Sequence, residues 1–191
     1  MTDLSGKSLG RYNLLERLGE GGMAVVYKAF DTRLETEVAV KVIRTEKLTE
    51  ETKERTLRRF DHEAKVLARL THPNIVTVTD YGEYEGNPYL VMPYLSGGTL
   101  KEQLSRPVAW EKAFHILAPI ARGLEYAHQH NIIHRDVKSS NILMTDSGQP
   151  MLSDFGVAKI LILDVSLDLT NVGMGIGTPA YMAPEQWTGK T

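Results

Sequence analysis

A cluster of three glycines lies between two strand-like segments near the start of the chain, and it restricts the fold more than any other feature. Gly19, Gly21 and Gly22 follow the segment 11–18 and precede the segment 25–30. Glycines in such a turn let backbone N–H groups approach a phosphate without a Cβ clash. A dinucleotide-binding fold would place a helix next, whereas here a strand-like segment follows. The cluster therefore favours a hairpin, which is either a phosphate cradle or a plain glycine-rich turn.

The next strand-like segment, 37–43, alternates with a period of two, so its valines share one face. Ala39 and Lys41 must then point the same way. A small residue leaves room for a flat ring, and an ammonium beside it can hold phosphate oxygens. Glu63, in the helical segment that follows, is a candidate partner for Lys41. The alternatives are a solvated edge lysine and one of many surface acids on a helix.

Two longer segments have helical patterns. The segment 46–70 is charged, and Phe60, Ala64 and Leu67 recur at i, i+4 and i+7, which predicts a narrow apolar stripe. The segment 110–130 repeats apolar residues every three or four positions. The residues expected to form its stripe are Ala113, Leu117, Ile120, Leu124 and Ala127.

Strands are also expected over 75–81 and 88–92, with Gly82 and Gly86 bracketing a turn. The residues Ser96-Gly97-Gly98 indicate a flexible joint. Strands with one helix precede this joint, and a mainly helical part follows it. The sequence thus predicts an α+β, two-lobed architecture with domains 1–95 and 96–191.

The segment 134–141 places an acid, two bases and an amide close together, and apolar residues pin it at both ends. A pinned Asp136 can accept or orient a hydroxyl proton. Lys138 can neutralise a migrating phosphoryl group, and Asn141 offers a neutral oxygen suited to Mg²⁺. The alternative is a solvated polar loop. Asp154, before Phe155 and Gly156, adds a carboxylate at a strand end, where a plain turn is the alternative.

The composition of the chain excludes several classes of function. With 191 residues and a net charge of -2, nothing indicates a nucleic-acid binder. The absence of cysteine excludes disulfides, thiolate metal sites and a cysteine nucleophile. No stretch reaches the roughly 18 apolar residues that span a bilayer, and we expect no signal peptide. A cytoplasmic location is the expectation.

In their order along the chain, these motifs resemble the signature set of eukaryotic-type serine/threonine protein kinases. The resemblance is strongest to the bacterial members and runs from about Arg11 to the C-terminus. The matching segments are the glycine loop 18–26, Val38-Ala39-Val40-Lys41, His134 to Asn141, Asp154-Phe155-Gly156 and Ala183-Pro184-Glu185.

The resemblance implies that the chain binds ATP and Mg²⁺ and phosphorylates serine or threonine hydroxyls of proteins. It implies that Lys41 holds the α- and β-phosphates and pairs with Glu63. It gives Asp136 the role of orienting and deprotonating the acceptor hydroxyl, and Lys138 a contact with the γ-phosphate. The implied metal ligands are Asn141 and Asp154.

The resemblance also outlines an adenine site. The residues implied to sandwich the base are Val26, Ala39 and Leu143. Met92 matches the gatekeeper position, and the hinge follows it with Pro93, Tyr94 and Leu95. The family's hinge uses a carbonyl and then an amide N–H. Pro93 retains the carbonyl and Leu95 the N–H, so the missing N–H of Pro93 should not matter.

In the glycine-rich loop, Ala24 takes the place of the family's third glycine. Alanine still allows a close approach, with less freedom in φ, so nucleotide binding is expected to survive. The loop residues expected at the nucleotide are Leu18, Gly19, Glu20, Gly21, Gly22, Met23, Ala24, Val25 and Val26.

Several further features of the family match later residues. Lys138 and the segment 177–181 resemble the serine/threonine type. Arg135 and Lys159 match the family's basic pocket for a phosphorylated loop residue. The first candidate for that residue is Thr170 and the second is Ser166. The alternative is that Thr170 and Ser166 are ordinary loop residues. The resemblance also implies an apolar spine, with plain core packing as the alternative. Its residues are Leu67, Val78, His134 and Phe155.

The chain stops six residues after Glu185, where complete members of the family continue with several helices. We therefore expect a complete N-lobe, an incomplete C-lobe and marginal stability or poor solubility. The alternative function is an inactive nucleotide-binding or scaffold fragment. The expected partners are protein substrates, and the resemblance is compatible with dimerisation for autophosphorylation. A membrane anchor would lie beyond Thr191.

Overall fold

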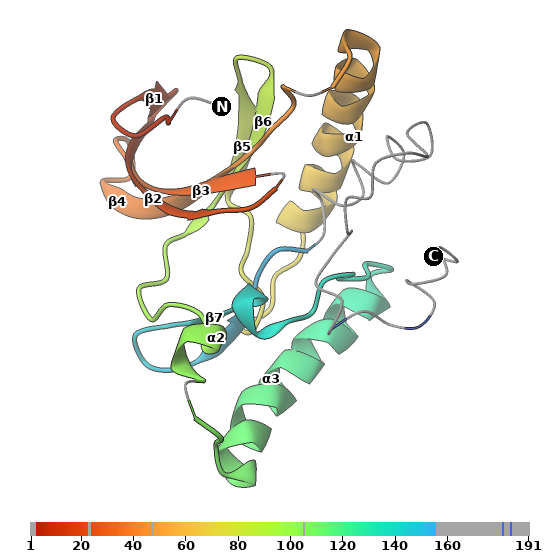
Figure 1. The fold of residues 1–191 in the computed structure, drawn as a ribbon. Helices are drawn as coiled ribbons and strands as arrows, with labels where there is room; N and C mark the ends of the chain where they lie inside the picture. Colours follow the sequence, from red (N-terminus) through yellow and green to blue (C-terminus); the bar gives the residue numbers. More distant parts are fainter. Residues whose placement is uncertain are drawn as a thin grey trace. The chain divides into compact units, whose positions relative to one another are not determined.

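The computed structural model describes residues 3–22, 24–46, 48–104, 106–155, 181 and 184. The chain divides into two compact units. The first comprises Met1–Thr71 and Val76–Tyr94, and the second comprises His72–Ile75 and Leu95–Thr191. The first contains an antiparallel sheet with one long helix, and the second contains the other described helices (Figure 1). The predicted α+β class is confirmed.

The sheet of the first unit has six strands in the order β1-β2-β3-β4-β6-β5. The strands are β1 (Ser8–Leu9), β2 (Tyr12–Glu20), β3 (Ala24–Asp31), β4 (Thr36–Ile43), β5 (Asp80–Tyr84) and β6 (Asn87–Pro93). Neighbouring strands are antiparallel throughout. The glycine cluster connects β2 to β3, so the predicted hairpin is confirmed.

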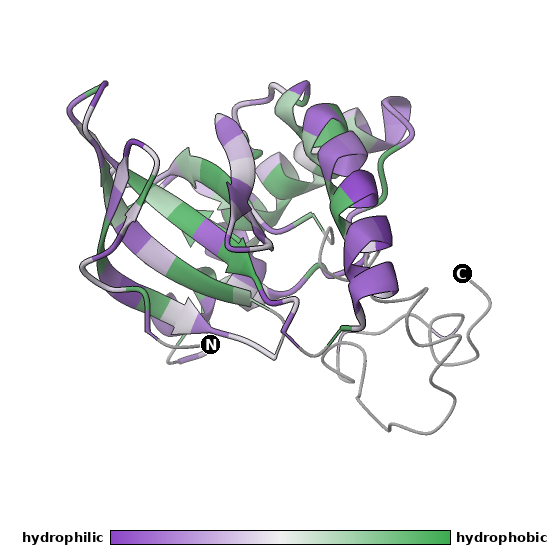
Figure 2. Cartoon of the chain, turned by 90° about the horizontal axis from the view of Figure 1, so that it is seen from above, coloured by the Kyte–Doolittle hydropathy of each residue, from purple (hydrophilic) through white to green (hydrophobic). Residues whose placement is uncertain are grey.

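One face of this sheet covers the core of the unit. Val38, Val40 and Val42 share one face of β4, as predicted, and this face lies in the core together with Tyr27 and Val91 from the flanking strands. In Figure 2 the strands carry hydrophobic residues interspersed with hydrophilic ones, whereas the long helix of the unit is largely hydrophilic. Burial of large apolar side chains stabilises the sheet by about 1.5–3 kcal/mol for each fully buried side chain.

The strand predicted over 75–81 is found later in the sequence. β5 begins only at Asp80, and Gly82 lies inside it. The turn to β6 is formed by Glu85 and Gly86, which both have positive φ, 49° and 76°. Two successive residues of positive φ are the hallmark of the type I′ turn, whose twist matches the flanking strands. The two glycines predicted a turn but not which of them formed it.

The long helix α1 (Glu50–Ala68) begins where Thr49 can cap it. The Thr49 hydroxyl accepts a hydrogen bond from the Thr52 N–H at 3.3 Å, which satisfies one of the unpaired donors of the first turn. The helix therefore starts later than the predicted residue 46. Phe60, Ala64 and Leu67 are buried, so the predicted apolar stripe is confirmed.

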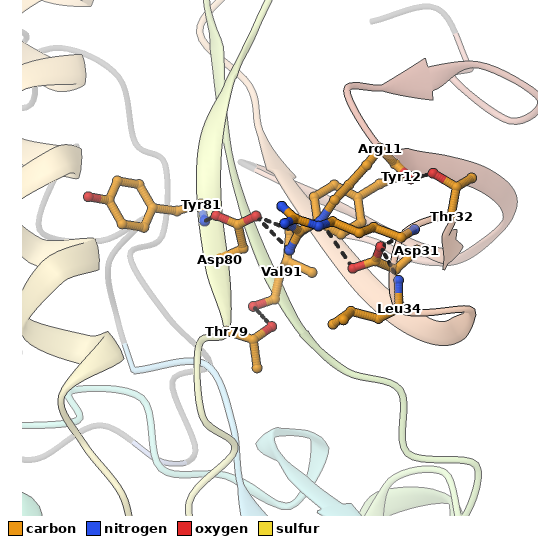
Figure 3. A network of polar contacts seen from close by, with 10 residues as sticks. Arg11, Tyr12, Asp31, Thr32, Leu34, Thr79, Asp80, Tyr81 and Val91 are labelled. Atoms are coloured by element: carbon orange, nitrogen blue, oxygen red, sulfur yellow. Dashed lines mark hydrogen bonds and ion pairs between the residues drawn. The ribbon is translucent and has the colours of Figure 1, made fainter.

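A polar network joins two strands that are far apart in the order of the sheet (Figure 3). Arg11 lies 3.1 Å from Asp31 and 3.1 Å from Asp80. The Tyr12 hydroxyl donates to Asp80 at 2.5 Å. Burial and this hydrogen bond raise the pKa of Tyr12, so the phenol keeps its proton and remains a donor. The network ties the start of β2 to the start of β5 and thus holds the sheet around its core.

The second unit contains α2 (Leu100–Gln103), α3 (Trp110–Gln129), the short 3-10 turn η1 (Ser139–Asn141), and the antiparallel pair β7 (Ile142–Met144) and β8 (Pro150–Leu152). The segment 72–75 belongs to this unit because of Asn74. The Asn74 carbonyl accepts the Leu152 N–H at 2.8 Å, and its side chain donates to the Pro150 carbonyl at 2.9 Å.

Helix α3 matches the predicted segment within one residue, and its predicted apolar stripe is confirmed in part, since Ile120 and Ala127 are buried whereas Leu117 is exposed. Its buried residues are Ile116, Ile120, Gly123 and Ala127. Leu117, expected in the core, is 54% exposed and shares one side of the helix with Trp110 and Phe114, which are 74% and 62% exposed. Two apolar stripes run along this helix, and periodicity alone does not say which one meets the core. No helix of the described part has both the length and the apolarity to cross a membrane.

The predicted flexible joint at residues 96–98 is instead held within the second unit. A Cβ on Gly97 would collide with the backbone carbonyls of Met144 and Thr145. The Gly98 carbonyl accepts the Met144 N–H at 2.9 Å, and its φ of 69° suits glycine. Here the glycines allow a close approach of two backbones.

Candidate active site

In the first unit, the candidate functional residues lie on the face of the sheet that points away from the core. In the strand register, Val26 lies opposite Lys41, and Ala39 lies opposite Met92. Residues directly opposite in an antiparallel pair share a face, so these four side chains point to the same side. Ala39 is 7% exposed and Met92 8% exposed. The predicted common direction of Ala39 and Lys41 is confirmed.

The glycine hairpin borders this face. The Gly21 N–H donates to the Ala24 carbonyl at 2.8 Å, which closes the turn. A Cβ built on Gly19 or Gly22 would meet nothing within 4 Å. Packing among the described residues therefore does not require glycine at these two positions, whereas the close approach of a ligand to the backbone would.

The side chains of the predicted loop residues do not all point the same way. Val25 is 1% exposed and lies in the core. Glu20 is paired with Val25 in the register, and its carboxylate contacts Arg17 and Arg44. Leu18 is exposed. Val25 and Glu20 could therefore contact a nucleotide only through their backbone. Met23 lies outside the described residues.

The remaining predicted residues of the first unit lie on α1 and at the end of β6. Glu63 is partly buried, next to the buried Ala64, and its pairing with Lys41 stays a prediction. Pro93 ends β6 opposite Val38. The Lys28 ammonium lies 4.7 Å from the centre of the Tyr94 ring, a cation–π contact at the last residue of the unit. The hinge roles of Pro93 and Leu95 stay predictions.

In the second unit, three predicted residues come together in the loop between α3 and β7. The Lys138 ammonium lies 2.9 Å from the Asp136 carboxylate. The Asn141 side chain donates to the Asp136 backbone carbonyl at 2.8 Å and to its carboxylate at 3.1 Å. Asp136 is thus held at both its backbone and its side chain, so the loop is not a plain solvated one.

His134 also holds the backbone of Asp136 in place. Its Nδ1 accepts the Asp136 N–H at 3.2 Å, and its Nε2 donates to the Ser153 carbonyl at 2.8 Å. One partner can only donate and the other can only accept, so the ring is the neutral Nε2–H tautomer. The Phe155 ring packs against it with a centroid distance of 4.6 Å. His134 is 1% exposed and Phe155 8% exposed.

Ser153 is a structural residue of the site that sequence reasoning missed. Its N–H and its hydroxyl both donate to the Asn141 carbonyl, at 2.8 Å and 3.1 Å. Its own carbonyl accepts from His134. Ser153 therefore ties the end of β8 to the loop that holds Asp136. Its place directly before Asp154 was the only available signal, and a serine there predicts nothing by itself.

Two site residues have a left-handed backbone. Arg135 has a φ of 63° and Asp154 a φ of 62°. Such values are uncommon for residues other than glycine and cost free energy that the surrounding contacts must offset. Both residues directly adjoin members of the hydrogen-bonded set, Asp136 and Ser153. The strain therefore falls on the two residues that set the direction of the candidate catalytic and metal-binding carboxylates.

The donor set of this unit fits a magnesium ion. Asn141 uses its amide N–H groups on Asp136, which leaves its carbonyl oxygen as a neutral ligand. Asp154 follows β8 with a partly buried carboxylate. Magnesium is bound in proteins by one or two such groups, with phosphate oxygens and water completing the octahedron. Within the described ranges no three His, Asp or Glu side chains gather around one point.

Leu143 lies in β7 between the buried Ile142 and Met144 and is itself only partly buried. Its side chain thus points to the opposite face of this strand pair. Tyr181 is described, and its hydroxyl lies 3.3 Å from the Ser139 hydroxyl. Several residues with predicted roles lie outside the described part of the chain: Gly156, Lys159, Ser166, Thr170, Gly177, Thr178, Ala183 and Glu185.

Residues 12–191 match the family model for the protein kinase domain, and the chain belongs to this family. The chain is 41% identical over 182 residues to a probable serine/threonine-protein kinase, PknB, of Lactococcus lactis, covering 94% of this chain and 28% of that protein. It is 39% identical over 189 residues to the serine/threonine-protein kinase PrkC of Bacillus subtilis, covering 97% of this chain and 28% of that protein. The chain thus spans under a third of these two relatives.

Solved structures give the same result for the fold. The PpkA-294 apo form superposes with a TM-score of 0.78 at 31% identity, over 96% of this chain and 70% of that one. The Mycobacterium tuberculosis PknI kinase domain superposes with a TM-score of 0.68 at 30% identity, over 82% of this chain and 64% of that one. The predicted protein-kinase fold is confirmed.

Proposed function

We propose that this chain transfers the γ-phosphoryl group of ATP to a serine or threonine hydroxyl of a protein. The observation that carries the proposal is the fixed position of Asp136. Its carboxylate contacts Lys138 and Asn141, and its backbone is held by Asn141 and His134. A carboxylate held in this way beside an ammonium suits a reaction in which a hydroxyl loses a proton to it while negative charge moves nearby.

In the proposed reaction, the acceptor oxygen forms a bond to the γ-phosphorus, and the bond from that phosphorus to the β–γ bridging oxygen breaks. Asp136 accepts the hydroxyl proton, and ADP leaves with the bridging oxygen. Lys138 holds the ammonium that neutralises charge on the phosphoryl group in transit. Its 21% exposure keeps this ammonium accessible to a substrate.

We assign the remaining roles residue by residue within each unit. We assign Asn141 and Asp154 as the Mg²⁺ ligands, and the metal when bound would neutralise charge on the phosphate oxygens. Lys41 would hold the α- and β-phosphates, steadied by Glu63. The apolar side chains of Val26, Ala39, Met92 and Leu143 would border the adenine, and the backbone of Pro93 and Leu95 would bind its edge.

The proposed acceptor class rests on the relatives, which are named serine/threonine-protein kinases. It also rests on Lys138, two residues after Asp136. A phosphorylated loop residue, Thr170 or Ser166, would be the regulatory counterpart of Arg135.

A phosphotransfer assay with radiolabelled ATP and a generic basic protein tests the proposal. Asp136→Asn is expected to lower the rate by about 10²- to 10⁴-fold, because it removes the proton acceptor. Asp61→Asn is the matched control, since Asp61 lies on the surface of α1 in an ion pair with Lys65 at 2.6 Å. Nucleotide binding without turnover in the unmodified chain would instead support an inactive nucleotide-binding fragment.

A further inference from the structure

The Glu20 carboxylate of the glycine-rich loop binds two arginines from different strands. Arg17 NH1 lies 2.6 Å from Glu20 Oε2, and Arg44 NH2 contacts Glu20 Oε1. Arg17 belongs to β2, and Arg44 follows the end of β4. The strands β2 and β4 are not neighbours, because β3 lies between them. Two strand spacings amount to about 10 Å, which a long arginine side chain can bridge.

An irregularity in β2 makes this arrangement possible. Arg17 and Glu20 are three residues apart and would point to opposite faces of a regular strand. The register shifts between Arg17 and Gly19, so that Arg17 lies opposite Tyr27 and Glu20 opposite Val25. A β-bulge of this kind re-aims the following side chains. Both residues thereby reach the same face of the sheet.

That face is the core face, on the other side of the sheet from Lys41. Val25 and Tyr27 both lie in the core, whereas Val26 is opposite Lys41. The Glu20 carboxylate and its two arginines therefore do not line the candidate nucleotide face. They hold the backbone that runs directly into Gly21 and Gly22.

We propose that Arg17, Glu20 and Arg44 form a clamp that positions the glycine-rich hairpin for nucleotide binding. This deepens the proposed function and rests on it. The clamp ties the β2 end of the hairpin to Arg17 of the same strand and to Arg44 beyond β4, while the Gly21–Ala24 hydrogen bond closes the tip. All three are positioning residues, since they act on a nucleotide only through the backbone of residues 19–22.

The expected size of the effect follows from exposure. The side chains of Arg17, Glu20 and Arg44 are 49%, 41% and 24% exposed, and ion pairs in such positions contribute little to stability. Salt screens them further. The clamp should therefore change nucleotide affinity modestly and in a salt-dependent way, with little effect on unfolding.

Equilibrium titration of the 191-residue chain with a fluorescent ATP analogue tests the clamp. Glu20→Gln and Arg44→Gln are each expected to weaken binding by about two- to fivefold at low salt. The double variant should bind no more weakly than Glu20→Gln alone, because removing Glu20 already removes the pair with Arg44. In high salt the variants should approach the unmodified chain.

Two further variants control the test. Arg44→Lys keeps the charge and removes the buried Nε, which has no hydrogen-bond partner within the described residues, so it should bind within about twofold of the unmodified chain. Glu54→Gln breaks an exposed pair with Arg58 on α1 and should leave affinity unchanged. Unchanged affinity in both Gln variants of the clamp, or effects that multiply in the double variant, would overturn the proposal.

Hydrogen exchange separates failure of the clamp from failure of the proposed function. If the unmodified chain binds no nucleotide, the proposed function fails, and exchange of the Gly21 amide in the unliganded chain decides the clamp. Faster exchange at Gly21 in Glu20→Gln and Arg44→Gln supports the clamp, because the Gly21–Ala24 bond then opens more often. Equal exchange rates in that case overturn it.

Discussion

His134 shows how much of the candidate site depends on a single ring. The ring is buried, and each nitrogen has a backbone partner, the Asp136 N–H on one side and the Ser153 carbonyl on the other. A buried polar group that loses its partner costs about 1–3 kcal/mol. The ring therefore matters through the two groups it satisfies as much as through its packing on Phe155.

We expect His134→Phe to destabilise the chain measurably, by about 1–3 kcal/mol for each backbone group left without a partner. Phenylalanine keeps the apolar contact with Phe155 and removes only the two nitrogens. Urea denaturation followed by circular dichroism measures the change, and His128→Phe, on the exposed side of α3, serves as control. A change equal to that of the control would show that the two hydrogen bonds contribute nothing.

Asp31 is expected to make the stability of the first unit depend on pH. Burial acts to raise the pKa of its carboxyl, but the N–H groups of Arg33 and Leu34 and the Arg11 guanidinium outweigh burial and hold the pKa below its ordinary value of 3.8. A lowered native pKa stabilises the fold above the unfolded value. That stabilisation is lost as the pH falls through the native pKa.

Asp31→Asn should therefore lower the melting temperature at pH 7, and the difference from the unmodified chain should shrink below about pH 4. Thermal melts at a series of pH values measure this. A gap that stays constant down to pH 3 would mean that charge on Asp31 plays no part.

At the scale of single residues, the sequence indicated which side chains could take part in the proposed reaction better than it indicated which residues they contact. Strand alternation was enough to place Ala39 and Lys41 on one face, because the period of a strand is fixed. It could not place Glu20, since one bulge in β2 reversed the direction that regular alternation implies. Nor could it find Ser153 and Asn74, whose hydrogen bonds join segments far apart in the chain.

Among the elements, the extents of β3, β4, β6 and α3 were predicted within one residue, whereas the buried side of α3 was harder to predict. Helix α3 was correct within one residue, and Ile120 and Ala127 of its predicted stripe are buried. Leu117 of that stripe is exposed, and Ile116 is buried instead. The hydrophobic pattern specifies that a helix forms, whereas the neighbouring elements decide which side they cover. The same holds for Gly97, where composition indicated flexibility and packing explains the glycine.

Gly97→Ala tests that explanation. A Cβ there meets the carbonyl oxygens of Met144 and Thr145, which belong to backbone and cannot swing away, so we expect a destabilisation of about 1–3 kcal/mol. Gly22→Ala is the control for stability, because its Cβ would meet nothing within 4 Å. If Gly97 served only as a joint, alanine would be neutral or slightly stabilising in the same urea titration.

At the scale of the whole molecule, the exposed side of α3 bears on whether the chain self-associates. Trp110, Phe114 and Leu117 lie at i, i+4 and i+7, and each is more than half exposed. Contiguous apolar surface of this kind favours association in water. Isolated exposed residues such as Leu34, 66% exposed on the first unit, are common and have no such effect.

We therefore expect the chain to self-associate as its concentration rises and to bind a dye specific for exposed apolar surface. Trp110→Ser combined with Phe114→Ser should shift the association to higher concentration by about tenfold or more, because two large aromatic surfaces leave the contact. Leu34→Ser should shift it far less, although it also removes a large exposed side chain. Sedimentation velocity over a concentration series measures both. A monomer at every concentration would show that the α3 surface drives no association, and equal shifts in the two variants would show that its contiguity is irrelevant.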